Sequence, residues 1–391
     1  VQSLHKDGIS VVMDVVYNHV YDAGSFCFNK IVPGYFSRIS PEGVYSQGSG
    51  CGNDTASERS MVSKYIVDSI LYWVEEYHID GFRFDLVCLI DTETINEIVE
   101  EVHKVRPDII LYGEGWPMST EFTKEGYHMT TQANSQMVPG FSFFNDTIRD
   151  ALKGSVFEET GKGYVQNAIG YKDTIADCFL GLPRWCKTPA QTINYASCHD
   201  NNTLWDRLQA SRTDASKEDL IKMNNLTAAI YMLSQGTPFI HAGEEMLRTK
   251  PDGKGGFDEN SYRSGDDVNA FRWENLSKPD YQKTIEYYRG LIAFRKAHDS
   301  LRLKYRKEVV NVVEMIPYRN SQVVVFKVTG NAKDILFIFN ACTDTVTVNL
   351  PTGNWNVMIQ DDVAGTDVLT VKEGSVDVAP ISATVLTQTK A

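Results

Sequence analysis

Carboxylate, histidine and arginine side chains gather at four points in this sequence, each at or just after an apolar run. The four segments are DVVYNH at residues 14–19, RFD at 83–85, GEGW at 113–116 and SCHDN at 197–201. Charged groups buried in such runs cost several kcal/mol unless they are paired, so a structural role alone does not explain the whole set. These segments therefore hold the candidate catalytic residues.

If the apolar runs are strands of one barrel, three of the acids would lie together at its carboxyl-terminal end: Asp85, Glu114 and Asp200. Retaining cleavage of a glycoside uses one carboxylate as nucleophile and one carboxylic acid as acid/base, about 5–5.5 Å apart. A third carboxylate can bind sugar hydroxyls and help to distort the ring. The residue types therefore favour the cleavage of a glycosidic bond.

The neighbours of two of these acids suggest different roles. Arg83 stands two residues before Asp85 and points to the same side of a strand, so it can keep Asp85 ionised and oriented as a nucleophile requires. Glu114 has only two glycines and Trp116 beside it in the sequence. An apolar, aromatic setting favours the protonated form of a carboxyl group, as a general acid requires.

The elements that must position these residues alternate between strand and helix. Helical spacing marks residues 62–77, 95–105, 220–233 and 281–298, and six short apolar runs precede residue 300: 9–16, 81–86, 109–114, 141–144, 192–196 and 238–242. Repeated strand, loop and helix are typical of βα units and a parallel sheet. We therefore expect an α/β fold, a (β/α)8 barrel whose chemistry lies at the carboxyl ends of its strands.

The chain begins with Val1 inside a predicted helix, so we expect an N-terminally truncated barrel with about strands 3–8 present. After residue 307 the alternation of predicted strands and helices ends. Short β-type runs follow, and they predict an antiparallel β-sandwich: 309–313, 323–328, 335–339, 346–350, 355–359, 368–371 and 383–388. The predicted domains are 1–307, the partial catalytic barrel, and 308–391, an all-β domain.

Composition narrows the classes of partner. The 391 residues carry a formal charge of −13, which opposes binding to nucleic acid and to anionic membranes, and no apolar run reaches 18 residues. Seven scattered cysteines without a CxxC pair predict free thiols, and together with the acidic charge they favour a cytoplasmic protein. We expect a monomer.

No cofactor is required by the candidate site. A metal held by His19, His199 and the acids is disfavoured because Arg83 would repel a cation, so no metal ligands are assigned. Calcium could bind loop oxygens, but no EF-hand-like spacing indicates it.

The four segments, read as DVVYNH, GFRFDLV, YGEGW and SCHDN in this order, resemble the signature regions of the α-amylase superfamily, glycoside hydrolase family 13. Within it the chain most resembles the type I pullulanases, which cleave α-1,6 branches, through GCGNDTASERSMVSKYIVDS, HAGEEMLRTK and SYRSGDDVNAFRW. Leu86-Val-Cys-Leu follows Asp85 where many α-amylases have a Lys-His pair. The tyrosine-containing motif that the family carries ahead of these regions is absent from the sequence.

The resemblance implies a role for each matching residue. Asp85 would be the nucleophile, Glu114 the acid/base and Asp200 the transition-state stabiliser. The substrate, a branched α-glucan such as pullulan, glycogen or a starch limit dextrin, would be bound by His19, Arg83, Trp116, His199 and Asn201, while Asp14 and Asn18 would be structural.

Two alternatives remain open. The chain could act on α-1,4 bonds, as a hydrolase or a transferase. It could also be a truncated glucan-binding fragment without catalysis, because strands of the barrel are expected to be missing.

Overall fold

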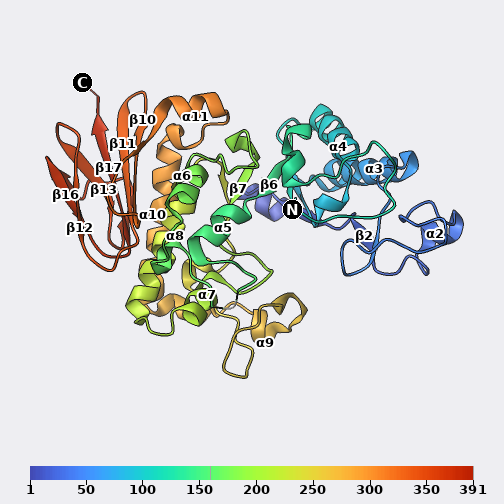
Figure 1. The fold of residues 1–391 in the computed structure, drawn as a ribbon, viewed down its shortest axis with the longest axis horizontal. Helices are drawn as coiled ribbons and strands as arrows, with labels where there is room; N and C mark the ends of the chain where they lie inside the picture. Colours follow the sequence, from blue (N-terminus) through green and yellow to red (C-terminus); the bar gives the residue numbers. More distant parts are fainter. Residues whose placement is uncertain (159, 391) are drawn as a thin grey trace. The chain divides into compact units, whose positions relative to one another are not determined.

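The computed structural model describes residues 1–158 and 160–390. The chain forms two compact units, one of Val1–Phe144 with Trp185–Lys187 and one of Asn145–Arg184 with Thr188–Ala391. Figure 1 colours them from blue to red along the sequence. The domain division at residue 307 stays a prediction.

Parallel strands form the centre of the first unit. β1 (Val12–Val15), β4 (Gly81–Phe84), β5 (Ile110–Gly113) and β6 (Ser142–Phe144) pair side by side in this order, each parallel to the next. Helix α3 (Ser60–Tyr77) lies between β1 and β4 in the sequence, and α4 (Thr92–Val105) lies between β4 and β5. The α/β alternation expected from the sequence is confirmed in this unit.

Both helices bury the apolar stripe that their periodicity predicts. In α3 the side chains of Val62, Ile66 and Ile70 are buried against the strands, as are Ile95 and Ile98 in α4. The Asp91 side chain caps α4 by accepting a hydrogen bond from the Thr94 amide at 2.8 Å. The other elements of this unit are short: α1 (Gln2–Lys6), β2 (His19–Val20), α2 (Cys27–Ile31), β3 (Asn53–Asp54), and the 3-10 turns Val87–Leu89 and Gln132–Met137.

The second unit begins with helices around two further parallel strands. β7 (Thr192–Asn194) pairs with β8 (Thr237–Pro238). Its helices are α5 (Asp146–Lys153), α6 (Lys172–Phe179), α7 (Leu204–Ser211), α8 (Lys217–Leu233), α9 (Asp266–Asn269), α10 (Pro279–Ala297) and α11 (Arg306–Val312). Its 3-10 turns span Tyr164–Gln166, Pro189–Gln191, Glu244–Met246, Ser261–Arg263, Trp273–Ser277 and Asp299–Leu301.

The C-terminal part of the second unit consists of antiparallel strands. The large sheet has the order β14-β13-β17-β11-β10-β9 with β15 paired to β13, and β12 pairs with β16 in a small sheet. Their bounds are β9 Val313–Ile316, β10 Val323–Thr329, β11 Lys333–Asn340, β12 Val346–Asn349, β13 Trp355–Gln360, β14 Val363–Ala364, β15 Thr370–Lys372, β16 Ser375–Val378 and β17 Ser382–Thr389. The β-rich C-terminal part expected from the sequence is confirmed.

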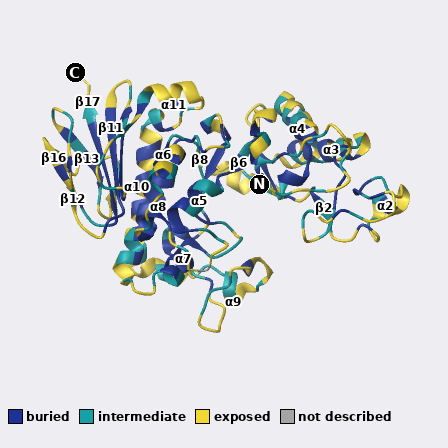
Figure 2. Cartoon of the chain, in the orientation of Figure 1, coloured by how far each residue is buried: buried dark blue, intermediate teal, exposed yellow. Residues whose placement is uncertain are grey.

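Each face of the large sheet belongs to a different core. Along β10, Val323 and Val325 point toward the small sheet, and Val324 and Phe326 point toward the helices, as the two-residue period of a strand requires. The Phe326 ring stacks on Phe179 of α6 with centroids 4.1 Å apart. Figure 2 shows the resulting run of buried residues from the helices into the strands.

One expected strand is a helix. Residues 309–313 were predicted as a β run, but α11 covers Arg306–Val312, and β9 begins only at Val313. The Glu308 carboxylate accepts hydrogen bonds from the backbone amides of Lys304 and Tyr305, at 3.2 and 3.1 Å, which closes a capping box around the first turn. Capping at the N-terminus therefore outweighs the β preference of the valines.

The stacked ring predicts the cost of removing it. Phe326→Ala should lower the free energy of unfolding by about 3–5 kcal/mol, because the side chain is fully buried between the sheet and α6. Urea unfolding followed by circular dichroism measures the change. Val368→Ala, at a valine that is 52% exposed, is the matched control and should change it by less than about 0.5 kcal/mol. Equal effects of the two substitutions would contradict this account of the core.

Candidate active site

Arg83 is the centre of a cluster of carboxylates in the first unit. Its Nη1 lies 2.9 Å from Asp14 Oδ1 and 3.0 Å from Asp85 Oδ1, and its Nη2 lies 2.5 Å from Glu114 Oε1. The Arg83 side chain is only 8% exposed, and that of Glu114 is 5% exposed. One guanidinium therefore holds the predicted nucleophile and the predicted acid/base side by side.

Strand register explains how these residues meet. Asp14 of β1 lies opposite Arg83 of β4, and Arg83 lies opposite Tyr112 of β5. Asp85 and Glu114 follow the ends of β4 and β5, and the parallel strands bring both ends to one edge. Although burial lowers the pKa of Arg83, the charges of Glu114, Asp14 and Asp85 together hold it above its usual value.

Asn18, in the loop after β1, and His19, the first residue of β2, extend the cluster. The buried Asn18 side chain donates from Nδ2 to Asp85 Oδ2 at 2.8 Å and to the Asp85 backbone oxygen at 2.5 Å. Its Oδ1 in turn hydrogen-bonds His19 Nδ1, and His19 Nε2 lies 3.5 Å from Cys51 Sγ. The structure thus brings together the residues predicted from the first two segments and Glu114 of the third.

The backbone around the two acids is tightly constrained. Leu86, directly after Asp85, has the left-handed φ of 37°, a conformation that costs a non-glycine residue about 1–3 kcal/mol. Its amide donates to Glu114 Oε2 at 3.0 Å, which ties the turn after β4 to the second acid. Gly113 has no room for a side chain, because a Cβ there would lie 2.5 Å from the Phe84 carbonyl oxygen. No sequence pattern marks the strained turn or this amide, because both depend on how β4 and β5 meet.

The surroundings of Glu114 differ from the sequence expectation. Residues adjacent in the chain suggested an apolar, aromatic setting, but the Arg83 guanidinium reaches it from the neighbouring strand. The buried Cys88 thiol is also close to Glu114. Burial, together with the charge of Glu114, raises the pKa of this thiol to about 12. Trp116, two residues further along, is partly exposed.

The residues of the fourth segment lie in the second unit. His199, Asp200 and Asn201 follow β7, and His199 Nε2 lies 3.6 Å from Asp200 Oδ2. Both side chains are open to solvent, 47% and 43% exposed, and Asn201 has a φ of 60°. These groups are available to contact a ligand.

A buried acid lies beneath this segment. Glu244 Oε1 accepts hydrogen bonds from Tyr231 at 2.7 Å and Tyr288 at 3.0 Å, and Oε2 accepts one from Ser197 Oγ at 3.0 Å. Ser197 Oγ also lies 3.4 Å from His241 Nδ1. Glu244 therefore ties α8 and α10 to the start of the segment that carries Asp200.

Burial shifts both titratable groups at this junction. It raises the pKa of Glu244 to about 7, against the lowering effect of the three hydroxyl hydrogen bonds, and it lowers the pKa of His241 to about 3. Near neutral pH the histidine is uncharged, and the glutamate keeps its proton to a higher pH than an ordinary carboxyl group.

Neither a metal centre nor a membrane helix is found among the described residues. No group of three or more His, Cys, Asp and Glu side chains in residues 1–158 and 160–390 could hold a metal ion. In the same residues, every helix is too short or too polar to cross a bilayer. The predictions on cofactors and calcium stay untested.

Comparison with known proteins identifies the family. A family model described as "Alpha amylase, catalytic domain" matches residues 52–299, which include Arg83, Asp85, Glu114 and Asp200. The chain belongs to the α-amylase family. The resemblance read from the four segments is thereby confirmed at the level of the family.

Relatives of this α-amylase-family chain include pullulanases. It is 36% identical to the pullulanase of Bacillus subtilis, over 90% of its own length and 49% of that relative. It is 33% identical to the chloroplastic pullulanase 1 of Arabidopsis thaliana, over 68% of its own length and 33% of that relative. The chain thus spans at most about half the length of these curated relatives.

Solved structures of pullulanases share the fold. The pullulanase from Bacillus acidopullulyticus matches with a TM-score of 0.91 and 37% identity, over 99% of this chain and 47% of that one. The pullulanase from Paenibacillus barengoltzii in complex with maltohexaose and α-cyclodextrin matches with a TM-score of 0.92 and 39% identity, over 100% and 60%.

The buried glutamate predicts a pH-dependent stability. Because the folded state raises the pKa of Glu244 above its ordinary value of 4.5, the folded chain retains a proton that the unfolded chain loses, and stability falls as the pH rises from about 4.5 to 7. Glu244→Gln, a neutral side chain of the same shape, should remove this loss. Relative to the unsubstituted chain it should gain about 1–3 kcal/mol in free energy of unfolding between pH 5 and pH 8.

Urea unfolding at both pH values measures the difference. The free energy of unfolding of the unsubstituted chain is subtracted from that of the variant at each pH. The contribution of His241 titration, which is present in both, then cancels. Glu245→Gln at the next, less buried position is the control and should show no such slope. A pH-independent difference for Glu244→Gln would contradict the assigned shift.

Proposed function

We propose that this chain carries the catalytic site of an α-1,6 debranching glycoside hydrolase of the pullulanase type, acting on branched α-glucans. The observation that supports it most is the Arg83 guanidinium shared between Asp85 and Glu114. The printed names of the relatives and structural neighbours support the substrate class, since one neighbour is a complex with maltohexaose.

The proposed reaction is a double displacement with retention of configuration. Asp85 Oδ attacks the anomeric carbon, the bond from that carbon to the branch oxygen breaks, and Glu114 gives its proton to the departing oxygen. The Glu114 carboxylate then takes a proton from water, which attacks the same carbon and releases Asp85. Arg83 and Asn18 orient Asp85 for attack, and the Leu86 amide orients Glu114.

The remaining predicted residues have supporting roles in this proposal. Asp200 binds sugar hydroxyls in the transition state, and His19, His199 and Asn201 hydrogen-bond the sugar at the cleavage position. Trp116, partly exposed and two residues after Glu114, stacks on a neighbouring glucose. Asp14 shares the Arg83 guanidinium and is structural.

We also propose that the parallel strands correspond to about strands 3–8 of a (β/α)8 barrel that ends near residue 307, followed by the β-sandwich of residues 308–391. The protein is proposed to be a cytoplasmic monomer that needs no cofactor. Binding of nucleic acid is opposed by the formal charge of −13.

The nucleophile gives the decisive test. The chain should convert pullulan to maltotriose, and Asp85→Asn should lower the rate by at least about 10⁴-fold, because an amide cannot form the covalent intermediate. Product chromatography measures both. Asp68→Asn, on the exposed surface of α3, is the control and should retain full activity.

Other products would assign other activities. Panose or maltose from pullulan would point to cleavage of α-1,4 bonds. Absence of cleavage by a folded chain would leave only binding of glucan.

The shared guanidinium gives a second prediction. Arg83→Lys should reduce kcat about 10²–10³-fold with little change in KM, since a compact ammonium group cannot reproduce the contacts that the two spaced nitrogens, Nη1 and Nη2, make to the three carboxylates. Steady-state kinetics on pullulan measure the two constants. Arg106→Lys, at an arginine that pairs with Asp80 and Asp108, is the control. An unchanged kcat for Arg83→Lys would refute the positioning role.

A further inference from the structure

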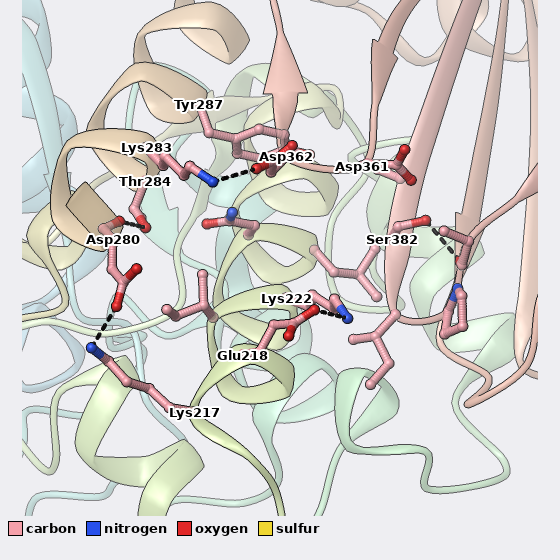
Figure 3. Close-up of a pocket in the computed structure, with 17 residues that line it drawn as sticks. Lys217, Glu218, Lys222, Asp280, Lys283, Thr284, Tyr287, Asp361, Asp362 and Ser382 are labelled. Carbon is pink, nitrogen blue, oxygen red and sulfur yellow. Dashed lines mark hydrogen bonds and ion pairs between the residues drawn. The ribbon is translucent and has the colours of Figure 1, made fainter.

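A pocket of about 720 Å³ lies within the second unit, between α8, α10 and two loops of the C-terminal strands (Figure 3). One is the turn Asp361–Asp362 between β13 and β14, and the other is the loop 379–381 between β16 and β17, with the first two residues of β17. Its volume is within the range of about 300–1,000 Å³ of small-molecule sites. None of its lining residues belongs to the candidate active site.

The lysines around this pocket already have acidic partners. Lys217 lies 2.7 Å from Asp280, Lys222 lies 2.8 Å from Glu218, and the labelled pair Lys283 and Asp362 are 3.8 Å apart. Between these pairs the wall is apolar, formed by side chains such as those of Ile221, Leu226 and Pro380. The pocket therefore has an apolar wall and a rim whose charges are largely balanced.

Asn225 is the unexplained residue of this pocket. Its side chain lines the cavity and is 5% exposed, yet its Oδ1 is buried without a hydrogen-bond partner among the described residues. A buried unsatisfied amide costs about 1–3 kcal/mol, and native proteins rarely retain one without a reason. A ligand toward which this amide turns would supply the missing hydrogen bond.

Two further polar groups face the same space. Asp361 has no hydrogen bond or ion pair to a described residue and has a left-handed φ of 57°. The buried Tyr287 lines the same pocket, and burial, together with the charges of Asp361 and Asp362, raises the pKa of its hydroxyl. Ile381 has a φ of 49°, which is a true outlier for a β-branched side chain. Strain of this kind collects at ligand-binding sites.

The chemistry of these groups selects among ligand classes. Asp361 and Asp362 would repel an anion, and the three lysines of the lining would repel a metal ion. A neutral molecule with several hydroxyls can donate to the Asn225 and Asp361 oxygens and accept from Tyr287, while its C–H face lies on the apolar wall. We propose that this pocket binds a short uncharged oligosaccharide through Asn225, Tyr287 and Asp361. That the sugar is a malto-oligosaccharide rests on the proposed function.

Maltotriose is the probe. The full chain carrying Asp85→Asn, which prevents turnover, is titrated with maltotriose by calorimetry, and hydrogen exchange with mass spectrometry locates the protected segments. We expect protection of residues 217–226, 279–287 and 379–383. Asn225→Leu, of similar shape, should weaken this binding about tenfold and abolish the protection.

Stability separates a ligand-binding amide from a structural one. Because Asn225→Leu removes an unpaired buried group, its urea midpoint should not fall, whereas loss of a structural amide would lower it. Asp361→Asn, which tolerates the left-handed backbone, is a second variant expected to weaken binding, and Asp367→Asn in the following loop is the control. Absent protection of the pocket, or binding unchanged in both variants, would overturn the proposal.

The outcome is separable from that of the proposed function. Cleavage of pullulan by the unsubstituted chain together with unaltered binding in the variants would remove only the pocket site. Loss of binding in the variants without any cleavage of pullulan would leave the pocket site and remove the proposed function.

Discussion

The arginine at the end of β4 is the constraint around which the first unit is built. A guanidinium that is 8% exposed is tolerated only when opposite charges surround it, and three carboxylates do so within 3.0 Å. Holding them there requires the parallel register of three strands. It also requires a left-handed Leu86 and a glycine before Glu114 that lets the strands approach closely.

Two of the buried glutamates, Glu114 and Glu244, show two ways of stabilising an acid inside this protein. Glu114 lies against a guanidinium, whereas Glu244 accepts hydrogen bonds from three neutral hydroxyls. Hydroxyl donors compensate burial only in part, so the pKa of Glu244 rises to about 7. The first arrangement places charge where chemistry is proposed, and the second connects two helices to the segment that carries Asp200.

The large C-terminal sheet has a structural part in two cores and also borders a cavity. Its alternating side chains pack on helices on one face and on the small sheet on the other. Two turns of these strands hold residues with a left-handed φ, the exposed Asp361 and the buried Ile381. The pocket lies where these turns meet the first turns of α8 and α10.

Much of this protein could be predicted from its sequence. Helical spacing located α3, α4, α8 and α10. In α3 and α4 it marks one buried stripe set by the local period, whereas α8 is buried on all sides from Met223 to Leu233. The four polar segments identified the family, since their residue types and order are properties of the chain itself. Residues 309–312 were misassigned because a capping interaction, not the β preference of the valines, decides their conformation.

Only the tertiary structure decided how these residues meet. Arg83 reaches Glu114 across 31 positions of sequence, the Leu86 amide donates to the same carboxylate, and Glu244 collects hydroxyls from three elements. Such contacts depend on strand register and helix packing, which no local pattern encodes. The sequence by itself therefore determined which groups are present and in what order. The fold decided which carboxylates contact the Arg83 guanidinium and which hydroxyls donate to Glu244.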